Sequence, residues 1–436
     1  MKVGLKNIFF MALFFSLSCA RIVQVFEKDR KKKQSLQMTS LSVKKKKEKE
    51  IICSSAETQI SFAGLSVENQ QIFEKILQEK LTSFSSPQKA ILWILFQMQT
   101  LSHIHNPSAG LQIFILKQKG QQQDSFFFNT TNQQKENPSL HLLYDMLKKT
   151  DPSISLASLE QTLSKNLPSK LFLEEGLYHF LKDRTTFIEK SLPLKERYLL
   201  SGEPLENQDK IAPLSSSPAL KEFMPLEDVT LSSLKPTTIW ENSPLLSSCN
   251  EKNSPSTILS YESAQHFVHP FAFYEKKGDE SFFMLGVSSI QYAQTGLQEE
   301  KGLLKGDALH QVGVFCSLKN ANGQSLGLIS LKEKDPFQHI KHLDPKSLMS
   351  LQSLSHLSKW AGSPRYEYLN SPPRLLLEGT QLSRQQLQSF LQENTPVYDA
   401  SPLGLIWGFG ILSHEEGLFL DPRTFFKGEK LSCLTP

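Results

Sequence analysis

The sequence FVHPFAFYEKKGDESFFMLGVSSI, residues 267–290, has a strand–turn–strand pattern. Two runs rich in aromatic and β-branched residues, 267–275 and 281–290, flank the turn Lys276-Lys277-Gly278-Asp279. Such runs around a glycine-containing turn predict a β-hairpin. Two further hairpins are indicated by the same pattern, at 312–318 with 326–331 and at 403–412 with 418–420. We therefore expect an antiparallel sheet in the C-terminal part of the chain.

One helix interrupts these hairpins. Ser383-Arg384-Gln385-Gln386 is a capping box, which predicts a helix over residues 383–394. Strands with an inserted helix predict an α+β domain over residues 261–436.

The N-terminal part of the chain has a helical pattern. Ser66 as N-cap and the apolar spacing behind it predict a helix to Phe84, and Ser86-Pro87 predicts the start of a second. A short strand is predicted over residues 111–116, and a loop is predicted over the Gln/Asn-rich residues 118–137. Further helices are predicted over 138–149, 152–166 and 170–182. We expect a mainly helical domain over residues 56–200.

Prolines separate the two expected domains. Residues 201–260 contain seven prolines among many serines, a density that interior helices and central strands do not tolerate. This segment is predicted to be a linker.

The first nineteen residues have the organisation of an export signal. Lys2 and Lys6 form a short basic region, and residues 7–15 form an apolar core, too short to cross a bilayer. Ser16-Leu17-Ser18-Cys19 follows. It resembles the bacterial lipoprotein signal, in which the cysteine is acylated, as with palmitate, and becomes the new N-terminus. The usual leucine three positions before the cysteine is Ser16 here, and ordinary signal peptidase could also cut this stretch, which would give a secreted protein.

A basic tether is expected behind the signal, over residues 20–55. Residues 21–50 carry eleven Lys and Arg against four acidic residues. Such a segment is predicted to be disordered, and it would attract an anionic membrane. It could also resist translocation and keep the chain inside the cell. The whole chain has a net charge of +4, and residues 1–50 have a net charge of +9, which leaves −5 for residues 51–436. Because binding a polyanion requires clustered basic residues, we expect no nucleic-acid partner for this acidic body.

Five cysteines are present without C-x-x-C spacing. If a lipid occupies Cys19, two disulfides are allowed among the other four, as is the alternative of buried or free thiols. These four are Cys53, Cys249, Cys316 and Cys433.

The catalytic candidate is Ser325 in Gly323-Gln324-Ser325-Leu326-Gly327, which fits the nucleophile-elbow pattern G-x-S-x-G. An elbow needs a strand before the serine and a helix after it, whereas the surrounding pattern predicts a hairpin.

Paired histidines are the metal-ligand candidates. His339 and His342 would share a helix face, with Asp344 as a carboxylate ligand. His266 and His269 flank a strand-like pair of residues that would put them on opposite faces. Because H-E-x-x-H does not occur, ordinary histidines are favoured, and we expect no metal and no cofactor.

These features favour an envelope protein anchored to a membrane by lipid and tether, with a binding or structural role and a protein partner. In the lipoprotein class that this signal resembles, an aspartate after the acylated cysteine is associated with retention in the inner membrane. Ala20 follows Cys19 here, so the resemblance favours the outer membrane. Two alternatives stay open: an envelope hydrolase with its site in the C-terminal domain, and an exported protein acting on another cell. Whether the protein is an enzyme is not decided by its sequence.

Overall fold

The chain divides into two units, Met1–Lys49 and Glu50–Pro436. The computed structural model describes only parts of the second unit, namely residues 53, 58–100, 109–130, 138–182, 184–206, 209–213, 238–241, 266–291, 298–300, 303–305, 307–308, 313–319, 324–331, 353–363, 365–370, 373–378, 396–400, 404–422 and 431–434. The signal with Cys19, nearly all of the tether, the predicted 383–394 helix, Cys249, and His339, His342 and Asp344 lie outside the described residues.

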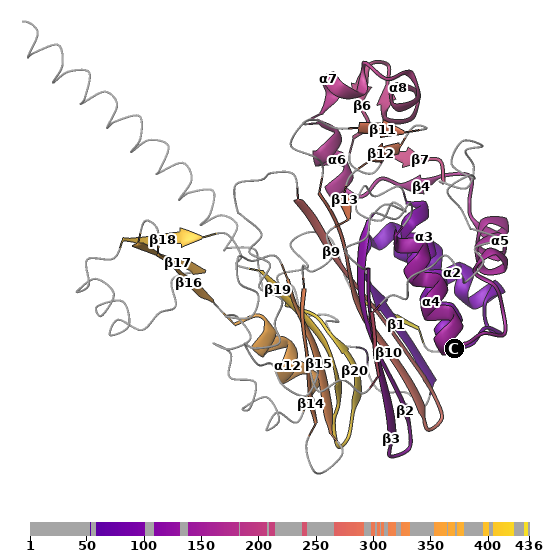
Figure 1. Ribbon diagram of the computed structural model, residues 1–436, viewed down its shortest axis with the longest axis vertical. Coiled ribbons are helices and arrows are strands. Elements are labelled where there is room, and N and C mark those ends of the chain that lie inside the picture. Colours follow the sequence, from indigo (N-terminus) through magenta and orange to yellow (C-terminus); the bar gives the residue numbers. More distant parts are fainter. Residues whose placement is uncertain are drawn as a thin grey trace, which may run out of the picture. The chain divides into compact units, whose positions relative to one another are not determined.

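A large antiparallel sheet forms the centre of the fold, in the order β21-β1-β9-β10-β2-β3-β8, with β13 paired to the end of β10 (Figure 1). Its strands are β1 (Thr58–Ala63), β2 (Gly110–Lys119), β3 (Gln122–Asn129), β8 (Thr238–Glu241), β9 (His266–Lys277), β10 (Glu280–Gln291), β13 (Asp307–Ala308) and β21 (Ser432–Leu434). The predicted hairpin of residues 267–290 is its middle, β9 and β10. The turn is only Gly278-Asp279, so both strands are longer than expected.

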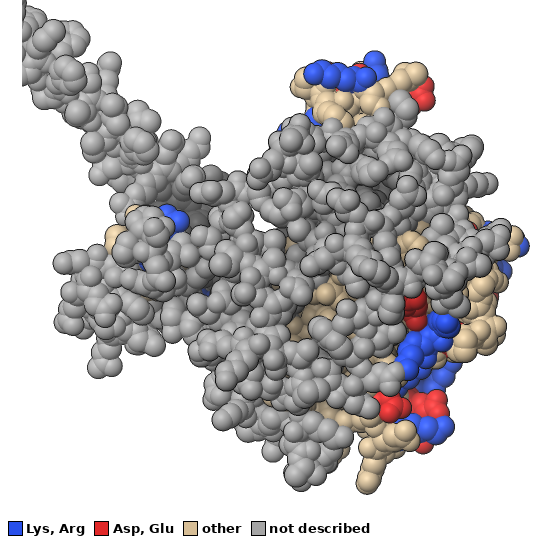
Figure 2. Space-filling view, viewed as in Figure 1, with Lys and Arg blue, Asp and Glu red and all other residues tan. Residues whose placement is uncertain are grey.

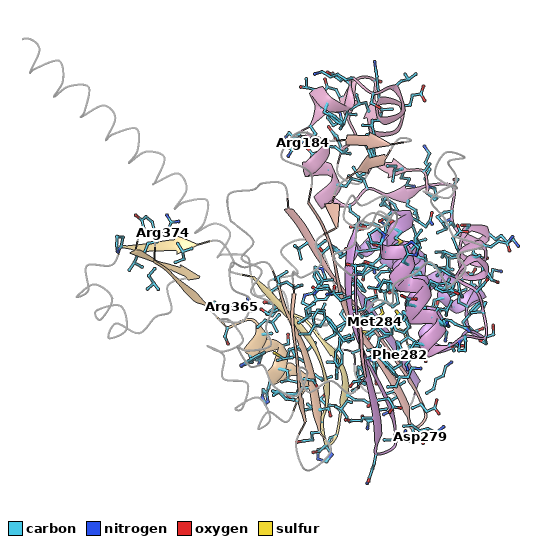
Figure 3. The ribbon with its side chains drawn as sticks, in the orientation of Figure 1. Arg184, Asp279, Phe282, Met284, Arg365 and Arg374 are labelled. Atoms are coloured by element: carbon cyan, nitrogen blue, oxygen red, sulfur yellow. A yellow bond between two sulfur atoms is a disulfide. The ribbon has the colours of Figure 1, made fainter. Side chains whose placement is uncertain are left out.

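Helices cover one face of this sheet (Figure 1). They are α2 (Val67–Lys80), α3 (Ser86–Gln99), α4 (Pro138–Thr150) and α5 (Leu156–Asn166). Alternation along the strands sends Phe271 and Phe273 of β9 into this layer, and Phe282 and Met284 of β10 with them (Figure 3). Trp93 of α3 is fully buried there, among the rings of Phe62, Phe73 and Phe96.

A second antiparallel sheet covers the other face, in the order β14-β15-β19-β20. Its strands are β14 (Gly313–Lys319), β15 (Ser325–Leu331), β19 (Leu405–Ile411) and β20 (Glu416–Phe419), and α12 (Leu354–Ala361) packs on its outer side. Between the sheets, the Phe409 ring stacks 4.6 Å from Phe283 and 5.9 Å from Phe114. The layers are therefore helices, sheet, sheet and helix, and the predicted α+β class is confirmed.

Short elements complete the described part of the chain. They are α6 (Glu175–Lys182), α7 (Thr185–Ile188), α8 (Leu192–Tyr198), the pairs β4 (Leu171–Phe172) with β7 (Lys210–Ile211), β5 (Leu199–Leu200) with β6 (Glu203–Pro204), β11 (Gln298–Glu300) with β12 (Leu303–Lys305), and the sheet β16 (Tyr366–Asn370), β17 (Pro373–Glu378) and β18 (Val397–Ala400). Within the residues described, no helix combines the length and apolarity that crossing a membrane requires.

The two expected domains, 56–200 and 261–436, are not separate bodies. Strands β1, β2 and β3 of the first share the central sheet with β9, β10 and β21 of the second. The stretch 118–137 is also not one loop, because Phe127 and Phe128 are buried on β3. Nor is residue range 201–260 only a linker, since β8 pairs with β3 at the sheet edge.

Candidate functional site

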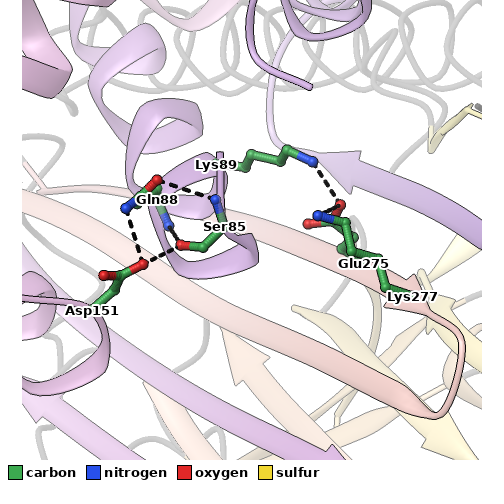
Figure 4. A network of polar contacts seen from close by, with 6 residues as sticks. All are labelled: Ser85, Gln88, Lys89, Asp151, Glu275 and Lys277. Carbon is green, nitrogen blue, oxygen red and sulfur yellow. Dashed lines mark hydrogen bonds and ion pairs between the residues drawn. The ribbon is translucent and has the colours of Figure 1, made fainter. Parts of the chain in front are cut away.

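Two polar clusters lie on the helix-covered face of the central sheet, at opposite ends of the β9–β10 hairpin. The first lies near the turn. Lys89, in the first turn of α3, places Nζ 2.7 Å from Oε1 of Glu275 on β9, and both side chains are almost completely buried (Figure 4). Lys277 Nζ lies 3.4 Å from the same oxygen and is half exposed. Burial lowers the pKa of Lys89, and the Glu275 carboxylate opposes that shift.

A capping network joins this cluster to α4 and α5. Ser85 caps α3: its Oγ accepts from the backbone N–H of Gln88 at 3.4 Å, and the side-chain Oε1 of Gln88 accepts from the backbone N–H of Ser85 at 3.1 Å. The Ser85 hydroxyl donates to Asp151, and Gln88 Nε2 donates to the same carboxylate oxygen at 3.0 Å (Figure 4). Asp151 thus holds α3 in place, and α5 begins after Ser155 instead of at the predicted Asp151-Pro152.

The pKa of Asp151 reflects this network. Burial on its own would raise the pKa, but hydrogen bonds from Ser153 and Ser85 outweigh burial and hold the pKa below its ordinary value. A carboxyl with a depressed pKa stabilises the fold above its ordinary pKa, and that stability is lost as the pH falls through the folded-state pKa.

We expect Ser85→Ala to lower the free energy of unfolding at pH 7 by about 1–2 kcal/mol, because a helix cap and a bond to a carboxylate are lost together. The loss should shrink as the pH falls below the ordinary range of an aspartate and through the depressed pKa of Asp151. Urea unfolding over a series of pH values from 7 downward measures it. Ser155→Ala, which removes only the α5 cap, is the matched control and should show no such pH dependence. Equal behaviour of the two variants would contradict the role given to Asp151.

The hairpin tip itself carries exposed ion pairs. Lys119 of β2 pairs with Glu280, and Figure 2 shows basic and acidic side chains side by side at these strand ends. On the opposite face, Glu416 of β20 pairs with Lys276 at 2.5 Å and accepts from the Ser281 hydroxyl at 2.9 Å, which joins the two sheets. Burial, followed by the Glu416 carboxylate, raises the pKa of Tyr274. The charges of this first cluster are paired within it, although Glu275 Oε2 is buried without a hydrogen-bond partner among the described residues, and we assign the cluster a structural role.

The second cluster lies where β9 begins and β10 ends. His269 of β9 stands directly opposite Ser288 of β10. Phe271 and Met284 face the helices, so alternation puts His269 and Ser288 on that same face. The Cβ atoms of such a cross-strand pair lie about 4.5–5.5 Å apart.

Gly64 shapes this cluster. The residue follows β1 with φ +132°, and a Cβ there would lie 2.9 Å from Phe271 Cβ and 3.2 Å from Gln97 Oε1. Its carbonyl oxygen can only accept, so His269 Nε2 donates to it. That bond makes Nδ1 the acceptor nitrogen of the neutral ring.

Gln97 of α3 completes the second cluster. It is fully buried, and neither its Nε2 nor its Oε1 has a hydrogen-bond partner among the residues described. Unmet buried amide groups are costly, and they concentrate where a ligand, water or reacting group belongs. Gln97 Oε1 lies close to Gly64, whose carbonyl oxygen accepts from His269.

Ser325 occupies a different kind of place. It is the first residue of β15 and pairs with Lys319 and Ile411, so G-x-S-x-G leads into a strand and not into a helix. Its Oγ donates to Gln123 Oε1 at 3.1 Å, and an amide oxygen cannot take a proton as a base. Nothing in this geometry activates the hydroxyl.

Of the remaining sequence candidates, some lie among the described residues and the others outside them. His266 pairs with Gln291 in register, three residues from His269 along β9. No cluster of metal-binding residues occurs within the described ranges. Glu415 accepts from the backbone N–H of Leu354 at the start of α12, and Glu416 pairs with Lys276. Sequence reasoning missed Ser288 and Gln97, which belong to no local motif.

Two cysteines far apart in the sequence are joined. Cys53 and Cys433 form a disulfide across a separation of 380 residues, with their Cα atoms 5.6 Å apart. Cys316 of β14 is disulfide-bonded as well. Cys53 lies where the predicted tether ends, and Cys433 lies on β21 at the edge of the central sheet. The bond therefore fixes the start of the folded body to its last strand.

Comparison with known proteins gives distant structural likenesses. No protein family and no curated protein matches the sequence. The crystal structure of cephalosporin acylase from Bacillus halodurans is similar with a TM-score of 0.47 and 8% sequence identity, over 89% of this chain and 98% of that one. At this TM-score and identity the likeness carries no information about activity.

Proposed function

We propose that the chain is an exported envelope protein, held at a membrane by a lipid on Cys19 and by the basic tether, whose layered body binds another molecule of the envelope. The observation that carries this proposal is the Cys53–Cys433 disulfide. Structural disulfides form and persist in oxidising compartments outside the cytosol, which is where the predicted export signal would deliver the body.

The position of the disulfide supports the same proposal. Because Cys53 lies near the end of the predicted tether, its disulfide fastens that end to the edge of the central sheet. Cys53 is buried and bonded at that junction, and its Sγ lies 3.8 Å from the Ser432 carbonyl oxygen on β21. The Lys-rich tether would add attraction to anionic lipid, about 1 kcal/mol for each basic residue near the surface.

The attachment is tested in Gram-negative cells that express the full chain with its own leader. We expect a metabolically incorporated fatty acid to label the wild-type protein, and Cys19→Ala to abolish the label and move the protein out of the outer-membrane fraction. Cys316→Ala is the matched control and should keep the label. An unlabelled wild type recovered from the medium would favour the secreted alternative, and labelling that survives Cys19→Ala would overturn the lipid assignment.

A further inference from the structure

The two cysteines of the Cys53–Cys433 disulfide differ in their exposure. Cys53 is 6% exposed and packs with the apolar side chains between the two sheets. On β21, the neighbours of Cys433 are buried on the helix-covered face, where Leu434 joins the core and Ser432 bonds to α2. Alternation along the strand turns Cys433 to the other face, and there, at the edge of the central sheet, it is exposed. A thiol in solution can therefore reach Cys433 in the folded protein.

Exposure matters because it controls disulfide exchange. A disulfide is exchanged when a thiolate attacks one of its two sulfurs, and the rate depends on access to the sulfur that is attacked. Exposed disulfides are the labile or regulatory ones, whereas the structural disulfides of secreted proteins resist reduction. Cys316 on β14, the other disulfide-bonded cysteine that the structure describes, is fully buried. The two bonds of this chain therefore differ in the property that controls exchange.

Contacts other than the disulfide also hold β21 in place. Its three residues pair in register with residues 60–62 of β1. The Ser432 hydroxyl donates to Gln70 Oε1 at 2.7 Å inside the fold, and Leu434 packs into the core. When the bond is open, the Cys53 thiol can donate to the Ser432 carbonyl oxygen, 3.8 Å from its Sγ. These contacts keep the two sulfurs near each other, so the bond can open and re-form while the body stays folded.

We propose that Cys433 is a thiol-exchange site, at which a dithiol protein of the envelope opens and re-forms the bond to Cys53. The closed bond is the resting state in an oxidising compartment. This site goes beyond the proposed function, because it makes the link between the tether and the last strand reversible. It rests on the disulfide that carries the proposed function, so the tests below include outcomes that distinguish the two.

The exchange balances in two steps. In the first, one thiolate of the dithiol protein attacks Cys433 Sγ, an S–S bond forms between the two proteins, and the bond to Cys53 breaks. Cys53 leaves as a thiolate and takes a proton from water. In the second, the other thiolate of the dithiol protein attacks its own partner sulfur in the mixed disulfide, and Cys433 leaves as a thiolate and is protonated. Two electrons pass to this chain and the dithiol protein is oxidised to a disulfide. The reverse sequence closes the bond.

The wild-type protein tests the lability of the bond without any variant. The folded full chain, with its disulfides intact, would be treated with increasing dithiothreitol under native conditions, quenched with an alkylating reagent and mapped by mass spectrometry. We expect Cys53 and Cys433 to be alkylated together, at a reductant concentration at least about tenfold lower than Cys316 requires, because access controls exchange. Circular dichroism should show that the body is still folded at that concentration. Cys316 is the internal control.

Two variants identify the sulfur that is attacked. Cys53→Ala leaves Cys433 as a thiol, and Cys433→Ala leaves Cys53 as a thiol. Both variants lack the same bond, so each is the matched control of the other. With oxidised glutathione, the Cys433 thiol should form a mixed disulfide at least about tenfold faster than the Cys53 thiol. In a denaturant that unfolds both variants the two rates should become about equal, because the difference comes from burial.

A bond between Cys53 and Cys433 that opens only together with that of Cys316, or only when the fold is lost, would overturn the exchange site. Equal native rates for the two thiols in the paired variants would overturn it as well. In both cases the bond itself exists, and the proposed function keeps its support. If folded wild-type protein taken from cells contained Cys53 and Cys433 as free thiols, the exchange site and the support for the proposed function would both be lost.

Discussion

Lys89→Met is expected to lower the free energy of unfolding by about 3 kcal/mol or more. The substitution keeps most of the side-chain volume but leaves the Glu275 carboxylate buried without its 2.7 Å partner, and a buried charge that loses its partner costs about 3–5 kcal/mol. Lys277, 3.4 Å away and half exposed, compensates only in part. Chemical denaturation followed by circular dichroism measures the change.

Lys75→Met is the matched control, because Lys75 pairs with Glu79 at 4.0 Å on the exposed side of α2. That variant should stay within about 0.5 kcal/mol of wild type. The double variant Lys89→Met/Glu275→Met should recover much of the loss, since no buried charge remains. If Lys89→Met were as stable as Lys75→Met, the buried pair would not have the role assigned to it.

Cys433→Ala is expected to destabilise the oxidised protein by about 2–5 kcal/mol. The bond to Cys53 closes nearly the whole folded body, and removing a long cross-link increases the conformational freedom of the unfolded chain. Loss of the bond also releases β21, whose Leu434 packs into the core under α2 and α3. Thermal unfolding under non-reducing conditions measures the effect.

The second cysteine supplies the control. Cys53→Ala and the double variant Cys53→Ala/Cys433→Ala should each match Cys433→Ala, because all three remove the same bond. Additive losses in the double variant would show that the two cysteines act separately, which would contradict the disulfide.

Local patterns predicted the helices well. The α2, α3 and α4 segments begin within a residue or a turn of their expected starts, because caps, prolines and apolar spacing are local signals. The pairing of β1 with β9, more than two hundred residues away, has no such signal. The predicted division into two domains is wrong for this reason, because strands from both halves share one sheet and one core.

Proline density also misled the linker prediction. β8 needs only four residues at an edge, Thr238–Glu241, and edge strands tolerate nearby prolines. In the Gln/Asn-rich stretch, burial of Phe127 and Phe128 by the fold outweighs the polar composition around them.

Predicting the second cluster from the sequence requires the correct register of the β9–β10 hairpin. The sequence pattern suggests His269 only as a metal ligand beside His266, and it does not single out Ser288. A two-residue turn at Gly278-Asp279 puts His269 nine residues before the turn and Ser288 nine residues after it, which makes them partners. The four-residue turn predicted from Lys276-Lys277-Gly278-Asp279 shifts the register and separates them. No local sequence pattern predicts that Gln97 belongs to this cluster, because only tertiary packing brings α3 close to Gly64.

If the body folds outside the cytosol with Cys53 bonded to the last strand of the sheet, the thiols of the protein in cells will show it. Cells expressing the full chain would be lysed in an alkylating reagent, and the protein digested without reduction and examined by mass spectrometry. We expect a peptide containing Cys53 linked to one containing Cys433, as the disulfide requires. Recovery of both cysteines as alkylated free thiols from correctly folded protein would contradict it.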